Sequence, residues 1–193
     1  MKKIISFFLI QFISFSLIAG TVDTVVIYSS GMHRPIKCVV IIPGNYKNDT
    51  THFPVVYLLH GYSGNYSNWI TKAPELKEMA DANKIMIVCP DGGFSSWYFD
   101  SPVDSTSKYE TYETIDVVHF IDKNYRTIAN KNHRAITGLS MGGHGALFLA
   151  LRHPDIFGAA GSMSGGVDLS ESRNRFDVMK RIGDTIIYAN NCL

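Results

Sequence analysis

The sequence has 193 residues, which is enough for one globular domain with a sizeable hydrophobic core. Hydrophobic residues make up 46% of the chain and charged residues 18%, a balance that excludes a disordered or low-complexity protein. The formal net charge is +1, and without Lys2 and Lys3 the basic residues fall from 18 to 16 against 17 acids. This charge argues against a nucleic-acid-binding surface.

The first 20 residues have the pattern of a secretory signal peptide. Two lysines at positions 2 and 3 precede an apolar run over 4–18, and the small residues Ala19 and Gly20 follow it. A membrane anchor helix is the alternative, but the run is short for a span and has no basic flank after it. We therefore expect a secreted or periplasmic protein with no stable membrane span after cleavage, whose domain covers 21–193.

Apolar runs closed by turn residues alternate with helical patterns along the rest of the chain. This alternation predicts an α/β protein with a mainly parallel sheet and helices on both faces. Strands are predicted at 22–28, 37–42, 55–59, 85–89, 134–137 and 157–162, with a short segment at 185–188 left unassigned. Helices are predicted at 75–83, 113–125, 143–151 and 173–181, the second of them with Ile115, Val118 and Tyr125 at helical spacing.

Residues 138–142, Gly-Leu-Ser-Met-Gly, match the G-x-S-x-G nucleophile elbow. A predicted strand precedes the motif and a predicted helix follows it, as the elbow requires. Glycines two positions either side of Ser140 permit a tight turn that holds its hydroxyl above the sheet edge. The motif predicts Ser140 as a nucleophile for acyl transfer.

The loop after the strand at 55–59 reads His60-Gly61-Tyr62-Ser63-Gly64. In this class of site one oxyanion-hole N–H comes from the residue after the nucleophile, here Met141, and the second comes from the loop after the third strand. We predict the Tyr62 N–H as that second donor, and Gly61 as the residue that lets a substrate approach. His60 is counted with the substrate-binding residues, although a structural role or a plain glycine-rich turn would also explain this loop.

Residues 91–100 follow a strand at the edge of the sheet where ligands bind in α/β folds. Trp97 and Tyr98 in this loop can stack on an aromatic acyl group or a sugar, or they can pack beneath the loop. Both alternatives are left open by the sequence.

A base and an acid for Ser140 are hard to identify. His60, His144, His153, His119, His33 and His52 all lie in positions that do not suit a general base. His144, for example, is on the helix that leads away from the elbow. Asp168, after the strand at 157–162, is a weak candidate for the acid, and the alternative is a loop aspartate that caps the next segment.

The three cysteines at positions 38, 89 and 192 do not form a disulfide pattern, and Cys38 and Cys89 read as small core residues. Cysteine and histidine do not cluster at metal-ligand spacing, and no glycine-rich phosphate loop is present. The sequence therefore predicts neither a metal nor a cofactor.

Several separated motifs together resemble the Putative esterase family of α/β-hydrolases, which includes S-formylglutathione hydrolases, feruloyl and acetyl-xylan esterases, and mycolyltransferases. They are LLHG before Tyr62, PDGG, SSWYFDSP, KYETY, AITGLSMGGHGALFLALRHPDIF and SMSGG. The resemblance implies a serine carboxylesterase with an acyl-enzyme on Ser140, the Tyr62 and Met141 amides as its oxyanion hole, and a small or polysaccharide-linked acyl ester as substrate.

The family has a later region with the acid and the histidine, so we expect this chain to be truncated after its sixth strand and of reduced activity. The strand at 157–162 would then be an exposed edge, which predicts marginal stability. Two other functions stay open: a non-catalytic carbohydrate-binding or interaction module, and acyl transfer to a sugar.

Overall fold

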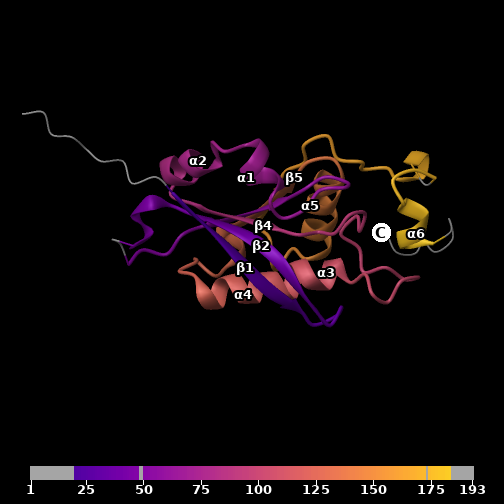
Figure 1. Ribbon diagram of the computed structural model, residues 1–193, viewed down its shortest axis with the longest axis horizontal. Helices are drawn as coiled ribbons and strands as arrows, with labels where there is room; N and C mark the ends of the chain where they lie inside the picture. Colours follow the sequence, from indigo (N-terminus) through magenta and orange to yellow (C-terminus); the bar gives the residue numbers. More distant parts are fainter. Residues whose placement is uncertain (1–19, 48–49, 173, 184–193) are drawn as a thin grey trace, which may run out of the picture.

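The computed structural model describes residues 20–47, 50–172 and 174–183. The predicted signal peptide (apart from Gly20), the segment at 185–188 and Cys192 lie outside the described residues. Within them the chain forms one sheet in the order β1-β2-β4-β3-β5-β6, with helices on either side (Figure 1). Among these residues, no helix is long and apolar enough to cross a membrane.

The strands follow the predicted runs closely. Pairing is parallel along β4-β3-β5-β6 and antiparallel for β1-β2 and β2-β4. The fold class predicted from the sequence is therefore confirmed, with an antiparallel hairpin added at one edge. The strands are β1 Thr21–Ser29, β2 Arg34–Ile42, β3 Val55–Leu59, β4 Met86–Pro90, β5 Arg134–Gly138 and β6 Ala159–Ala160.

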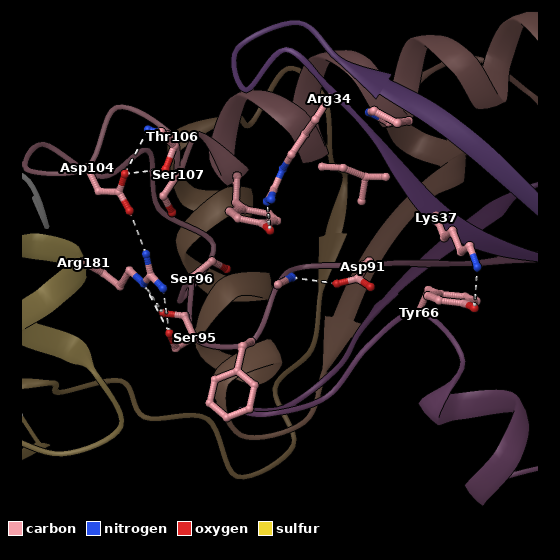
Figure 2. A pocket seen from close by; sticks show the side chains of 15 residues that line it. Arg34, Lys37, Tyr66, Asp91, Ser95, Ser96, Asp104, Thr106, Ser107 and Arg181 are labelled. Carbon is pink, nitrogen blue, oxygen red and sulfur yellow. Dashed lines mark hydrogen bonds and ion pairs between the residues drawn. The ribbon is translucent and has the colours of Figure 1, made fainter.

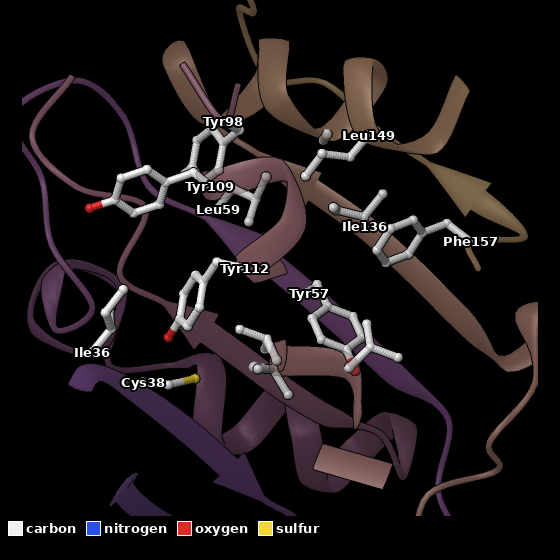
Figure 3. Packing of buried hydrophobic residues seen from close by; sticks show 14 of the residues in the cluster. Ile36, Cys38, Tyr57, Leu59, Tyr98, Tyr109, Tyr112, Ile136, Leu149 and Phe157 are labelled. Carbon is white, nitrogen blue, oxygen red and sulfur yellow. The ribbon is translucent and has the colours of Figure 1, made fainter. Parts of the chain in front are cut away.

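Residues of the central strands alternate between two buried clusters. On β4, Met86 and Val88 join one cluster, whereas Ile87 and Cys89 join the other. Figure 3 shows part of the larger cluster, in which the rings of Tyr57 and Phe157 meet edge to face at 5.7 Å. Burial on both faces explains why these strands read as continuous apolar runs.

Helices cover both faces of the sheet. α2 (Leu76–Asn83) packs on one face through Leu76 and Ala80, beside α1 (Asn68–Lys72). α5 (Met141–Arg152) and a long helical segment over 109–124 pack on the other face. A last short helix, α6 (Val178–Ile182), overlaps the segment predicted to be helical at 173–181.

The helix predicted at 113–125 differs from the observed one. It begins earlier, as α3 (Tyr109–Thr111), continues as a wide π-helical turn (Tyr112–Val117), and ends as α4 (Val118–Asn124). The wide turn changes the angular spacing of the side chains, so Ile115 is 58% exposed while Glu113 is buried.

The sixth strand is shorter than predicted. β6 has two residues, both exposed, at one edge of the described sheet. The backbone nevertheless runs along β5 beyond β6, because the N–H groups of Gly158, Gly161 and Met163 donate to carbonyls of β5.

Cys38 and Cys89 are free and buried, in agreement with the prediction that both are core residues. Burial raises the pKa of the Cys89 thiol to about 12.

Candidate active site

Ser140 occupies the sharp turn between β5 and α5. Its backbone has φ 56° and ψ −115°, a combination that residues other than glycine rarely adopt. The residue is exposed. The G-x-S-x-G turn uses strain of this kind to hold its serine above the sheet. The local geometry therefore suits the nucleophile predicted from the sequence.

Close backbone contacts fix this turn. The Ser140 N–H donates to the Met163 carbonyl at 2.8 Å, and the Gly142 N–H donates to the Leu139 carbonyl at 2.8 Å. A Cβ atom on Gly142 would lie only 2.7 Å from the carbonyl oxygen of His60. The second glycine of the motif is thus required because α5 begins directly against the end of β3.

The loop after β3 passes beside the nucleophile. A Cβ atom on Gly61 would lie 3.6 Å from the Ser140 Cβ, so the Gly61 backbone adjoins the reacting side chain. Met141 is the first residue of α5, where a backbone N–H has no acceptor one turn earlier in the helix. Met141 and Tyr62 therefore belong to the two segments that flank Ser140, and their role as oxyanion donors stays a prediction.

His60 is buried and ties two loops together. It is 2% exposed, its Nε2 accepts the Gly92 N–H at 2.9 Å, and its Nδ1 lies 2.8 Å from the Gly61 carbonyl oxygen. Because Nε2 accepts, the proton is on Nδ1 and is donated to Gly61. His60 thus orients the loop beside Ser140. This corrects its predicted place among the substrate-binding residues.

The sequence left two alternatives open for Trp97 and Tyr98, stacking on a substrate and packing beneath the loop, and the structure agrees with the second. Their side chains are 4% and 0% exposed, and both residues have positive φ. The Trp97 indole N–H donates to the Phe176 carbonyl and the Tyr98 hydroxyl donates to the His60 carbonyl, each at 2.9 Å. The two rings therefore pack beneath the loop, and the observation that favoured a non-catalytic carbohydrate-binding module is removed.

Tyr98→Phe should lower the free energy of unfolding by about 1–2 kcal/mol, because the buried His60 carbonyl loses its donor. Urea unfolding measures this change, with Tyr28→Phe as the control because Tyr28 is 60% exposed. Substrate affinity should not change. A higher KM for Tyr98→Phe at unchanged stability would instead show that Tyr98 contacts the substrate.

Three other aromatic side chains form an exposed cluster next to the Gly61 loop. The ring of Tyr62 meets the rings of Phe94 and Phe176 edge to face at 5.0 and 5.3 Å. Phe94 is 59% exposed and Phe176 is 50% exposed. The sequence could not tell which aromatic ring of the loop 91–100 is covered and which is exposed, because composition does not show it.

In the part of the chain that the structure describes, no histidine hydrogen-bonds to the Ser140 hydroxyl. His144 is 8% exposed among the rings of Trp97, Phe99 and Phe148, and burial lowers its pKa to about 4. His153 instead lies 2.8 Å from a Glu110 carboxylate oxygen. These environments agree with the prediction that neither histidine is the base.

Asp168 is an exposed residue in the loop after β6. Its carboxylate accepts the Ser170 N–H at 2.9 Å, and hydrogen bonds from Ser170 lower its pKa. This local hydrogen bond to the start of the short turn Ser170–Ser172 agrees with the capping alternative. Among the described residues, no group of three or more His, Cys, Asp or Glu side chains could hold a metal ion.

The family model described as "Putative esterase" matches residues 29–186. Esterase Rv1288 of Mycobacterium tuberculosis (strain ATCC 25618 / H37Rv) is 34% identical over 133 residues, which cover 67% of this chain and 29% of that protein. The endo-1,4-beta-xylanase/feruloyl esterase of Xylanibacter ruminicola is 32% identical over 166 residues, or 79% of this chain and 22% of that protein. The chain thus spans less than a third of the length of these two curated relatives.

Solved structures agree with this assignment. A ferulic acid esterase aligns with a TM-score of 0.73 and 30% identity, covering 90% of this chain and 69% of the other. An S-formylglutathione hydrolase from Agrobacterium tumefaciens has a TM-score of 0.73 at 21% identity, covering 93% and 71%, and shows the fold alone. The family model covers most of the sequence, so the chain belongs to the Putative esterase family, has the α/β-hydrolase fold, and shares a family relationship that supports ester hydrolysis.

Proposed function

We propose that the chain is a serine carboxylesterase that forms an acyl-enzyme on Ser140. The observation that carries this proposal is the strained, exposed Ser140 at the start of α5, with the Gly61 backbone beside it. A serine held in this way has no evident structural purpose, since its backbone strain costs on the order of 1–3 kcal/mol.

In the proposed reaction the Ser140 oxygen bonds to the ester carbonyl carbon and its proton passes to a base. The oxyanion that forms is held by the N–H groups of Met141 and Tyr62. The carbon–oxygen bond to the alcohol then breaks, the alcohol leaves with the proton, and water releases the acid from Ser140 by the same route. We assign the base to none of the described histidines. With no base at all, the oxyanion hole and binding alone would leave a residual rate enhancement of about 10³–10⁴ over water.

The proposal extends to location and substrate. The amino-terminal pattern supports secretion, and the feruloyl and ferulic acid esterases among the similar proteins support an acyl ester carried by a polysaccharide. The exposed aromatic cluster of Tyr62, Phe94 and Phe176 would offer ring edges and faces to an aromatic acyl group near Ser140.

Hydrolysis of p-nitrophenyl acetate by the chain and by Ser140→Ala tests the proposal. Removing the nucleophile from an intact triad enzyme costs on the order of 10⁶ in kcat, so the variant should fall to the residual rate of about 10³–10⁴ over water. Ser105→Ala, at another exposed serine, should keep the parent rate. Mass spectrometry after treatment with a fluorophosphonate reports the nucleophile even when turnover is slow. Equal rates together with no adduct on Ser140 would refute the proposal.

A further inference from the structure

A cavity of about 620 Å³ is lined by residues other than Ser140, Met141 and the loop of Gly61 (Figure 2). It lies between the start of β2, the end of β4, the loop that follows β4, and Arg181 of α6. Its volume is in the range of small-molecule sites. The side chains around it are mostly polar and charged, unlike the aromatic cluster next to Ser140.

Three cations and two carboxylates line this cavity, and they are not all paired. Arg181 is neutralised by Asp104 at 2.9 Å and also donates to Ser95. Arg34 donates to the Tyr109 hydroxyl at 2.7 Å and has no carboxylate within ion-pair distance among the described residues. Its guanidinium carries five donors, most of which are therefore available to a ligand.

Lys37 adds a second cation without a carboxylate partner in the described part of the chain. Its ammonium lies 3.4 Å from the Tyr66 hydroxyl and 5.4 Å from the centre of that ring. The carboxylate of Asp91 accepts the Gly93 N–H at 2.9 Å on the same side of the cavity. The three cations outnumber the carboxylates of Asp91 and Asp104, so the lining has a net positive charge.

Hydroxyl groups supply the rest of the polar lining. One of them, Ser107, is 3% exposed, and its hydroxyl has no hydrogen-bond partner within the described residues. Tyr66 and Tyr109 line the same space. Hydroxyls, a fork of guanidinium donors and aromatic rings together are the groups that bind a sugar with an acidic substituent.

The position of the cavity relates it to Ser140. Strands β4 and β5 are separated by β3 alone, which puts their ends about 10 Å apart at the usual strand spacing. Phe94 lines the cavity, packs against Tyr62, and accepts the Ser63 N–H at 2.7 Å through its carbonyl. One substrate can therefore place its ester bond at Ser140 and a neighbouring sugar in the cavity.

We propose that this cavity binds a carboxylate-bearing sugar residue on the alcohol side of the ester, with Arg34 as its main partner and Lys37 as a second charge. The position of the ester bond at Ser140 rests on the proposed function, whereas binding of the sugar in the cavity does not depend on that function.

The test measures equilibrium binding to the full chain carrying Ser140→Ala, so it needs no turnover. Methyl glucuronide and methyl glucoside are the probes, because they differ in the carboxylate. We expect the glucuronide to bind about tenfold more tightly, as a charge-assisted contact provides, and to lose this advantage in Arg34→Gln. Lys72→Gln, which removes a cation from the exposed end of α1, should keep the preference.

Lys37→Gln provides a second variant at an exposed position, should Arg34→Gln fail to fold. It should weaken glucuronide binding by a smaller factor, and added salt should weaken it further. Equal binding of the two probes, or a preference that survives both variants, would overturn the inference. Displacement of the glucuronide by lower concentrations of inorganic phosphate would also overturn it, in favour of a phosphate site. Binding without ester turnover would leave this inference standing while the proposed function fails.

Discussion

Gly142→Ala should lower the free energy of unfolding by about 3 kcal/mol, although alanine is the better helix former by about 1 kcal/mol. The new Cβ would collide with the carbonyl oxygens of Leu59 and His60, at 2.7 Å from the second. Both atoms belong to the backbone at the end of β3, so neither can rotate away. The steric term therefore outweighs the gain in propensity.

The same substitution should reduce any activity at Ser140. To relieve the contact, α5 must move away from β3, and this separates Met141 from the loop of Gly61 and Tyr62. Misplacement by about 1 Å can cost on the order of 10²-fold in rate. The measurements are a thermal melt, where 3 kcal/mol corresponds to a drop of roughly 6–12 °C in Tm for a chain of this size, and the ester assay.

Gly161→Ala is the matched control. Its Cβ would meet the Thr137 side-chain oxygen at 3.1 Å, and a side chain can adjust. We expect a change of less than about 1 kcal/mol there. If Gly142→Ala melted at the same temperature as Gly161→Ala, the requirement for glycine at the elbow would have another origin.

The sequence predicted the central strands because their physics is local. A strand buried on both faces must be apolar at every position, and β3 and β4 show this directly. The elbow was predictable for the same reason, since the turn at Ser140 requires glycine at fixed positions. These features do not depend on which distant segment packs against them.

The loop 91–100 shows where such reasoning stops. Tyr98 is buried because Gly92 and Gly145, 53 positions apart in the sequence, leave room for its ring. Phe94, in the same loop, is left in solvent next to Tyr62. Which aromatic ring faces a substrate is thus decided by tertiary contacts that the spacing along the chain does not show.

The cavity at Arg34 was equally hidden. Arg34 and Asp91 are far apart in the sequence and line the same cavity because β2 runs antiparallel to β4, so that the start of one strand lies beside the end of the other. If β2 ran parallel to β4, the start of β2 would lie at the other end of the strands. The antiparallel pair, which the sequence did not predict, therefore determines what lies next to the candidate active site.

Glu113 presents the other large effect. The side chain is 1% exposed in the wide turn before α4, and neither carboxylate oxygen has a hydrogen-bond partner among the described residues. Burial, and secondarily the charge of Asp91, raises the pKa of Glu113 well above its usual value. The folded chain therefore holds this carboxyl as the neutral acid over a pH range in which the unfolded chain has released the proton.

The consequence for stability follows from the proton balance. Between the unfolded pKa, about 4.3, and the raised folded pKa, the folded state binds one more proton than the unfolded state. The contribution of Glu113 to stability is thus fully present below about pH 4.3 and is lost as pH rises, by about 1.4 kcal/mol per pH unit up to the folded pKa. Glu113→Gln keeps the shape of the neutral acid, but its side chain has no proton to release when the chain unfolds.

We therefore expect Glu113→Gln to be more stable than the parent at pH 8 and similar to it at pH 4.5. Urea unfolding across this range measures the difference, and Glu78→Gln, at an exposed position of α2, should change the pH profile little. Two parallel profiles for Glu113→Gln and the parent would mean that the carboxyl ionises in the folded chain as it does in the unfolded one.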